Sequence, residues 1–231
     1  MKIQGIERLS LVDYDGYTAC TVFLAGCNLR CPYCQNAALV MGDADEAISE
    51  GELFDYLRKR RGLLDAVCIS GGEPTLRSAE LPLFCRRIKA LGYRVKLDTN
   101  GTNSRLVKRL VNEGLVDYIA MDIKAPPSDY PSLLCADDDA PARISETVSF
   151  LLERRISYEF RTTLVSEMID EDGIRAIGQL LQGADKLFLQ KFEDRGGNLV
   201  EGLTAVPREL AEQYAEILSA SVKHVSLRGY V

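Results

Sequence analysis

Residues Thr18–Ala25 (TACTVFLA) form a short apolar and β-branched run that ends at a glycine. A run of this length and composition is typical of a strand buried on both faces of a sheet. Five runs of the same kind follow along the chain, and they are Ala66–Ser70, Arg94–Asp98, Tyr118–Asp122, Ser157–Leu164 and Lys186–Gln190. The repeated pattern predicts six strands of one sheet.

Amphipathic stretches separate these predicted strands. The first, Ser49–Arg60, has Ser49 followed three residues later by Glu52, which is the spacing of a capping box. Five more predicted helices are Leu81–Leu91, Ser104–Glu113, Ala142–Arg154, Asp172–Leu181 and Pro207–Ser219. Strands that alternate with helices indicate βαβ units and a parallel sheet, which right-handed crossovers curl toward a barrel. The predicted fold class is therefore α/β, a partial β/α barrel of about six units.

The length of 231 residues predicts one domain with a single core. We expect the barrel core to span about residues 17–192 and a C-terminal helix and strand to occupy residues 200–231. The last segment, Val222–Val231, alternates loosely, which is compatible with a closing strand or with a tail that docks on the partner. In a parallel barrel, functional residues gather at the carboxyl ends of the strands.

The composition excludes several classes of function. With 28 Lys and Arg against 34 Asp and Glu, the net charge is −6, so broad nucleic-acid binding is not expected. No apolar run approaches the roughly 20 residues that span a bilayer, and Met1–Arg8 lacks the apolar core of a signal peptide, which predicts a cytoplasmic protein without membrane contact. The single histidine, His224, makes most His-based metal sites and a Ser-His-Asp hydrolase improbable.

Three cysteines, Cys27, Cys31 and Cys34, form a C-x3-C-x2-C loop directly after the first predicted strand. Structural zinc sites usually take four protein ligands, and ordinary electron-transfer clusters take four cysteines. Three cysteines on a four-iron cluster would leave one iron open to a ligand. The alternative is a closed zinc or iron–sulfur site with Cys20 as the fourth ligand, although a thiol in mid-strand is common packing material. The remaining cysteines are scattered singly: Cys68 in a strand, Cys85 in a helix and Cys135 in a loop.

Other polar residues follow the next strands. Gly71 and Gly72 would allow a ligand to approach the backbone closely, and Glu73 adds a carboxylate suited to an ammonium group. The alternative for this segment is a simple turn that leads into a helix. Asp98 and Asp122 close two further strands, and with Thr99 they offer oxygen ligands for a cation; capping of the following helices is the alternative for the two aspartates.

Taken together, these motifs resemble the radical S-adenosylmethionine superfamily. The aromatic Tyr33 before the last cysteine of the triplet and the Gly71–Pro74 segment are similar to that superfamily. Leu97–Gly101, Met121–Lys124 and Tyr158–Thr162 resemble the activating enzymes of glycyl radical proteins. Leu9–Gly16 and Phe188–Phe192 look like one subgroup, the anaerobic ribonucleoside-triphosphate reductase activating proteins.

The resemblance implies a set of ligand contacts. Cys27, Cys31 and Cys34 would hold one [4Fe-4S] cluster, and Glu73, beside Gly71 and Gly72, would meet the amino group of S-adenosylmethionine. The remaining implied contacts are Lys124 and Arg161 for the methionyl carboxylate and ribose, Tyr33 and Phe192 for the adenine, Asn36 as a weaker contact, and Asp98, Thr99 and Asp122 for a monovalent cation. In related pyruvate formate-lyase activases a histidine occupies the region of Phe192, so the ribose side differs here.

The implied activity is reductive cleavage of S-adenosylmethionine and abstraction of a hydrogen from a glycine of a partner glycyl radical enzyme, expected to be anaerobic ribonucleotide reductase. Since no extra cysteine cluster is present, an external reductant such as flavodoxin is expected. Two alternatives stay open. One is an enzyme of the same superfamily that acts on a small molecule, as the carboxy-deazaguanine synthases do. The other is a non-catalytic metal-binding or electron-carrier module closed by Cys20.

Overall fold

In the computed structural model, which describes residues 1–34, 37–41 and 45–230, eight strands form one sheet whose order follows the chain. The strands are β1 (Ile3–Ser10), β2 (Ala19–Leu24), β3 (Ala66–Gly71), β4 (Arg94–Thr99), β5 (Tyr118–Asp122), β6 (Ser157–Leu164), β7 (Lys186–Lys191) and β8 (His224–Arg228). β1 pairs with β2 in antiparallel fashion, and all later neighbours are parallel. The predicted α/β class with six β/α units, β2 to β7, is confirmed.

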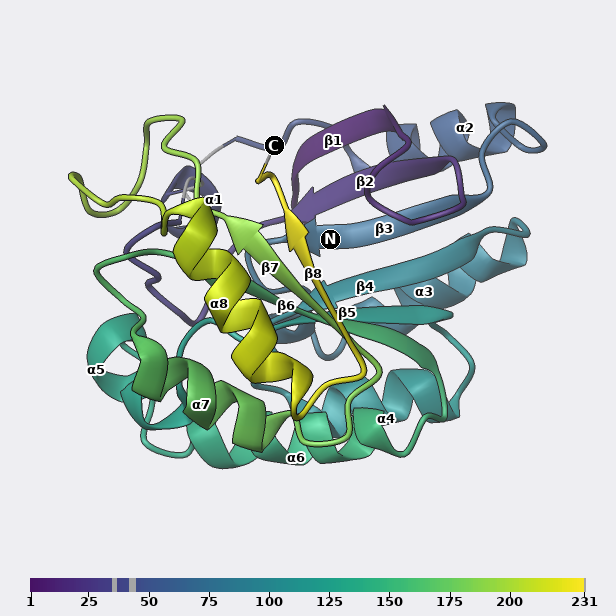
Figure 1. The fold of residues 1–231 in the computed structure, drawn as a ribbon. Helices are drawn as coiled ribbons and strands as arrows, with labels where there is room; N and C mark the ends of the chain where they lie inside the picture. The colour runs from purple at the N-terminus through teal and green to yellow at the C-terminus, as the bar shows by residue number, and fades with distance from the viewer. Residues whose placement is uncertain (35–36, 42–44, 231) are drawn as a thin grey trace.

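The helices lie outside the curled sheet (Figure 1). They are α1 (Ala37–Met41), α2 (Glu50–Lys59), α3 (Leu81–Ala90), α4 (Ser104–Asn112), α5 (Tyr130–Leu134), α6 (Ala140–Leu152), α7 (Glu171–Leu180) and α8 (Arg208–Ser219), with single 3₁₀ turns at Pro74–Leu76 and Pro127–Asp129. The barrel is not closed, because β1 and β8 are the two edges of the sheet. Among the described residues, no helix combines the length and the apolar composition that crossing a bilayer requires.

Local sequence signals account for where several elements begin. Ser49 caps α2 as predicted: its hydroxyl accepts a hydrogen bond from the Glu52 N–H at 3.2 Å, and its own N–H donates to the Glu52 carboxylate at 3.0 Å. The six predicted strands and six predicted helices are all present, with ends that differ by at most two residues. The C-terminal segment contains β8, which pairs with β7 at the edge of the sheet and does not close the barrel. Three elements were not predicted: β1, α1 and α5.

The two faces of the sheet differ in chemistry. The outer face packs on the helices through apolar side chains such as Ile69, Leu97 and Phe160, all fully buried. The inner face carries charged residues, and Lys96 is one of these although only 4% of its surface is exposed. Its ammonium donates to the Asp13 carbonyl oxygen at 2.5 Å, so the turn between β1 and β2 closes the amino end of the barrel. Figure 1 shows the opposite end, toward which the arrowheads of the parallel strands point.

Candidate functional site

A cavity of about 480 Å³ lies at the carboxyl ends of the parallel strands. Twelve predicted site residues line it: Cys27, Cys31, Tyr33, Cys34, Gly71, Gly72, Glu73, Asp98, Thr99, Asp122, Lys124 and Phe192. They come from five segments far apart in the sequence, so the parallel topology brings them together. Asn36 lies outside the described residues.

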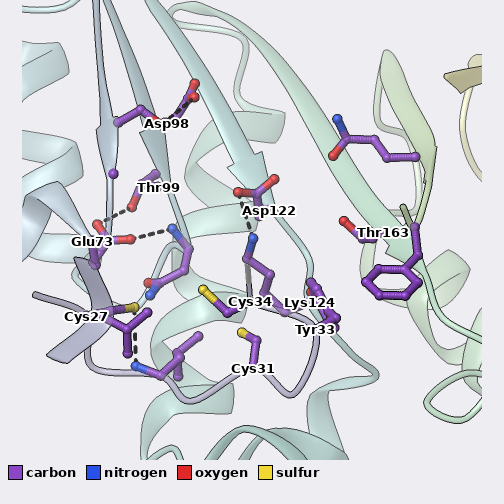
Figure 2. Close-up of a pocket in the computed structure, with 18 of the residues that line it drawn as sticks. Cys27, Cys31, Tyr33, Cys34, Glu73, Asp98, Thr99, Asp122, Lys124 and Thr163 are labelled. Atoms are coloured by element: carbon purple, nitrogen blue, oxygen red, sulfur yellow. Dashed lines mark hydrogen bonds and ion pairs between the residues drawn. The ribbon is translucent and has the colours of Figure 1, made fainter. Parts of the chain in front are cut away.

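The cysteine loop follows β2 and forms one wall of the pocket. Figure 2 shows the sulfur atoms of Cys27, Cys31 and Cys34 on the pocket side of this loop. The loop is held by hydrogen bonds from the Cys34 N–H to the Cys31 carbonyl oxygen at 2.9 Å and from the Arg30 N–H to the Leu134 carbonyl oxygen at 2.8 Å. Burial raises the pKa of the Cys27 thiol, and it raises the pKa of Cys31 to about 12. Both thiols therefore stay protonated unless a metal replaces the proton.

The position of Cys20 contradicts the closed-site alternative. Its side chain is fully buried in the apolar core, and within the described chain it does not line the pocket. No group of three His, Cys, Asp or Glu side chains in residues 1–34, 37–41 and 45–230 converges closely enough to hold a single metal ion. A four-iron cluster is larger than one ion, so three thiols spaced along a loop fit it better. Cys68 and Cys85 are buried as predicted, and Cys135 is exposed at the end of α5.

Glu73 lies beside the start of the cysteine loop, next to Cys27 (Figure 2). Its carboxylate, on a residue only 1% exposed, accepts from the Thr75 N–H and hydroxyl at 3.0 and 2.5 Å, from the Thr99 hydroxyl at 2.8 Å and from the Asn100 N–H at 2.6 Å. Burial raises the pKa of Glu73, while these hydrogen bonds act in the opposite direction. All these donors are neutral, and no Lys or Arg of the described chain forms an ion pair with this residue. A ligand ammonium would supply the missing positive charge.

The two glycines before Glu73 serve a purpose that the sequence did not reveal. A side chain at Gly71, where φ is +115°, would collide with the Leu24 backbone, and a side chain at Gly72 would collide with the Gly26 carbonyl oxygen. The Glu73 N–H donates to that same oxygen at 2.8 Å. These glycines therefore allow β2 and the cysteine loop to approach closely. The expectation that they also admit a ligand stays a prediction, and both line the pocket.

Charged residues of β4, β5 and β6 form a network beside the cavity. The Arg161 guanidinium donates to both oxygens of Asp122 at 2.8 and 3.1 Å and lies 3.4 Å from Asp98. Lys124 pairs with Asp122 at 3.0 Å. Burial alone would raise the pKa of Asp122, but the charges of Arg161 and Lys124 hold it at about 2. Burial would likewise lower the pKa of Lys124, whereas Asp122 raises it well above its ordinary value.

This network changes two expectations. Arg161 does not line the pocket in the described structure but lies behind the two aspartates, so direct contact with ribose or carboxylate is not supported. The three residues expected to bind a cation are largely engaged, since Asp122 is paired with two basic groups and Thr99 donates to Glu73. Only Asp98 keeps an oxygen, Oδ1, that is buried without a hydrogen-bond donor among the described residues.

Two aromatic residues, one from the cysteine loop and one from the segment after β7, form part of the cavity wall. Tyr33 and Phe192 both line it and are 7% and 4% exposed. Within the described chain, the Tyr33 hydroxyl is buried without a hydrogen-bond partner, which leaves one polar atom for a ligand. Flat aromatic faces and an unpaired hydroxyl fit a polar aromatic ring such as adenine.

Sequence reasoning missed several further lining residues. Among them are Ser70, Thr163, Gln190 and Arg228, one from each of β3, β6, β7 and β8. Ser70, Thr163 and Gln190 each lie two positions from a residue already singled out (Gly72, Arg161 and Phe192), so the period of two along a strand is the signal that could have found them. Arg228 stacks on the Phe188 ring at 3.4 Å, and nothing in its local sequence marks it.

Comparisons with known proteins agree with this geometry. The family model of the Radical SAM superfamily matches residues 21–178. A protein of Methanocaldococcus jannaschii that is named as a glycyl-radical enzyme activating enzyme is 32% identical over 84% of this chain and 80% of its own length. A 7-carboxy-7-deazaguanine synthase of Koribacter versatilis is 30% identical over 64% of this chain and 62% of its own. The crystal structure of Streptococcus suis SuiB bound to the precursor peptide SuiA has a TM-score of 0.70 at 14% identity, covering 90% of this chain. The matched part is 48% of SuiB, so this chain spans about half of that protein.

Proposed function

The chain belongs to the Radical SAM superfamily, and from this premise we propose that it is an activating enzyme that generates a glycyl radical in a partner protein. The observation that carries the proposal is the pairing, across one cavity, of three pocket-facing thiols with a buried carboxylate that has no cation of its own. This donor set fits a [4Fe-4S] cluster together with S-adenosylmethionine. When bound, these groups supply a one-electron cleavage of the sulfonium whose product abstracts a hydrogen atom.

The residues of this chain bind, orient and shield. Cys27, Cys31 and Cys34 would hold three irons, and Glu73 would hold the ammonium group of the ligand. Lys124 reaches the cavity from the end of β5 and would lie near the ligand carboxylate, held in place by Asp122. Tyr33 and Phe192 would enclose the adenine and keep water away from it. A monovalent cation, as proposed from the resemblance, would have to bind at Asp98 Oδ1.

The size of the cavity favours a macromolecular substrate. A volume of about 480 Å³ is within the range of one small-molecule ligand, and S-adenosylmethionine would take most of it. A second reactant then reaches the reacting carbon from the open side of the barrel, which suits a chain segment that carries a glycine. By sequence resemblance we propose anaerobic ribonucleotide reductase as this partner and flavodoxin, or a similar carrier, as the reductant.

The test is to reconstitute the protein with iron and sulfide without oxygen, reduce it, and add S-adenosylmethionine with anaerobic ribonucleotide reductase. We expect a glycyl radical signal in the electron paramagnetic resonance spectrum and about one 5′-deoxyadenosine per radical formed. A partner that stays without a radical while 5′-deoxyadenosine accumulates would contradict the activation of this partner.

The second candidate is a radical enzyme for a small heterocycle, which the similarity to the deazaguanine synthase favours. It predicts that the same reconstituted protein forms 7-carboxy-7-deazaguanine from the precursor used by that synthase. Both assays use one preparation, so a single experiment separates the two candidates.

A further inference from the structure

An apolar groove lies on the hairpin of β1 and β2, outside the pocket described above. Phe23 lies within it, and Leu9, Leu11 and Val12 project from its rim with 57%, 70% and 80% of their surfaces exposed. Scattered exposed apolar residues are ordinary, but three large ones within four positions, all lining one groove, are typical of an interaction site.

The turn that carries these side chains is well held. The Ser10 hydroxyl accepts hydrogen bonds from the N–H groups of Val12 and Asp13 at 3.3 and 3.1 Å. The Asp13 carboxylate accepts from the Thr21 hydroxyl at 2.5 Å, and its carbonyl oxygen accepts from Lys96. Because the backbone is fixed, docking on Leu11 and Val12 would cost little ordering of the turn.

An ion pair links the hairpin that carries this groove to a residue that lines the cavity at the carboxyl ends of the strands. Asp15, three residues after Val12, pairs with Arg228 of β8 at 3.2 Å. Arg228 also lines the pocket.

The charges beside the groove are acidic. Glu7 lines it, and no basic side chain of the described structure forms an ion pair with that carboxylate. Asp13 also lines the groove, whereas the charge of Asp15 is matched by Arg228. The neighbouring Arg8 points to the other face of β1, where its guanidinium lies 5.1 Å from the centre of the Tyr56 ring. An occupant with apolar and basic side chains would complement this surface.

We propose that the groove is the docking surface for an extended, apolar and basic segment of the partner protein. The apolar side chains contact Leu11 and Val12, and a basic side chain faces Glu7. The assignment rests on the proposed function only in naming the protein that supplies the segment.

The test uses fluorescein-labelled 15-residue peptides with a central glycine and the reconstituted holoprotein, without reductant. One peptide carries two leucines and a lysine before the glycine; a second has serines for the leucines; a third has glutamate for the lysine. We expect fluorescence anisotropy to show at least tenfold tighter binding of the first peptide than of either other one.

Variants locate the site. The double variant Leu11→Ser, Val12→Ser should weaken binding of the first peptide at least tenfold, whereas Leu63→Ser, which changes another exposed leucine (64% exposed), should leave it unchanged. Glu7→Lys should reverse the preference so that the glutamate peptide binds better than the lysine peptide, a result that misfolding cannot produce.

Equal binding of the three peptides, or no effect of the double variant, would overturn the proposal. So would sedimentation showing that the chain forms a dimer that the double variant dissolves, because the groove would then belong to a second copy. Peptide binding requires no turnover, so its loss in a protein that still activates its partner refutes the groove alone. Normal peptide binding without any glycyl radical refutes the proposed function alone.

Discussion

Buried polar groups at the two ends of the barrel differ in whether the protein supplies their hydrogen-bond and ion-pair partners. At the amino end, the buried Lys96 donates to the Asp13 carbonyl oxygen and lies 3.6 Å from the Glu159 carboxylate. At the carboxyl end, Glu73 forms no ion pair and the Tyr33 hydroxyl is buried without a hydrogen-bond partner among the described residues, while Asp98 Oδ1 has only the Lys96 ammonium, 3.7 Å away. Buried polarity without a partner costs stability, so its concentration at one end points to ligands that supply the partners. Changes at the carboxyl end should therefore reduce activity, and changes at the amino end should reduce stability.

The largest effect is expected from the cysteine loop. The variant with Cys27, Cys31 and Cys34 changed to alanine should lose its iron and lower S-adenosylmethionine cleavage at least about a thousandfold, equivalent to about 4 kcal/mol. Circular dichroism should still show a folded protein. Cys135→Ala, at an exposed thiol, is the matched control and should keep both iron and activity. Undiminished cleavage by the triple variant would show that these cysteines do not hold the cluster.

The strongest effect on stability is expected at Lys96. Lys96→Met would leave Asp98 and Glu159, which lie 3.7 and 3.6 Å from the ammonium, without this buried cation. Removing one partner of a buried charge cluster costs about 3–5 kcal/mol, to be measured by urea unfolding. Lys108→Met, which breaks a more exposed pair with Glu146, should cost much less. Equal losses of unfolding free energy for the two variants would show that the buried position of Lys96 does not make its charge more important.

Glu73→Gln tests the role of the negative charge at the carboxyl end, because it removes the charge and keeps the shape of the side chain. We expect affinity for S-adenosylmethionine, measured by calorimetry, to fall about 10- to 100-fold, since a hydrogen bond to a charged group contributes about 1.5–3 kcal/mol. Glu159→Gln is the counterpart within the same barrel. Glu159 is equally buried but pairs with Lys96 and Arg228, so its loss should lower the melting temperature and leave the affinity nearly unchanged.

The smallest effect concerns Asp185, which precedes β7 at the amino end. Hydrogen bonds and charges from Arg154 and Lys223 lower the pKa of Asp185 from 3.8 to about 2. A folded-state pKa below the unfolded value stabilises above about pH 4, and this stability is lost as the pH falls toward 2. Asp185→Asn should lower the melting temperature by about 2–4 °C at pH 6, after allowing for solvent screening. The difference from wild type should shrink toward zero near pH 2; a constant difference would show that the charge is unimportant.

Much of the fold was predictable because a strand buried on both faces has to be apolar throughout. β1 was not predicted because many of its residues, such as Glu7 and Arg8, are polar and exposed at the edge of the sheet. The sequence allowed us to predict which residues line the site, because the carboxyl ends of parallel strands lie at one end of the sheet. The contacts within the site could not be predicted. Gly72 contacts Gly26 and Arg161 contacts Asp122, and no local sequence pattern links residues so far apart in the chain.

The strand order also bears on how the protein is made. Since each strand pairs with the one synthesised just before it, the sheet can grow from its edge while the ribosome is still translating, and no strand has to insert between two others. The thiols up to Cys34 leave the ribosome early, whereas Phe192 follows 192 − 34 = 158 residues later. At about 5–20 residues per second, this interval lasts roughly 8 to 32 seconds. Throughout that time the nascent cysteine loop is uncovered on the side that β7 later encloses, so its sulfurs meet oxidants and stray metals before the barrel can shelter them.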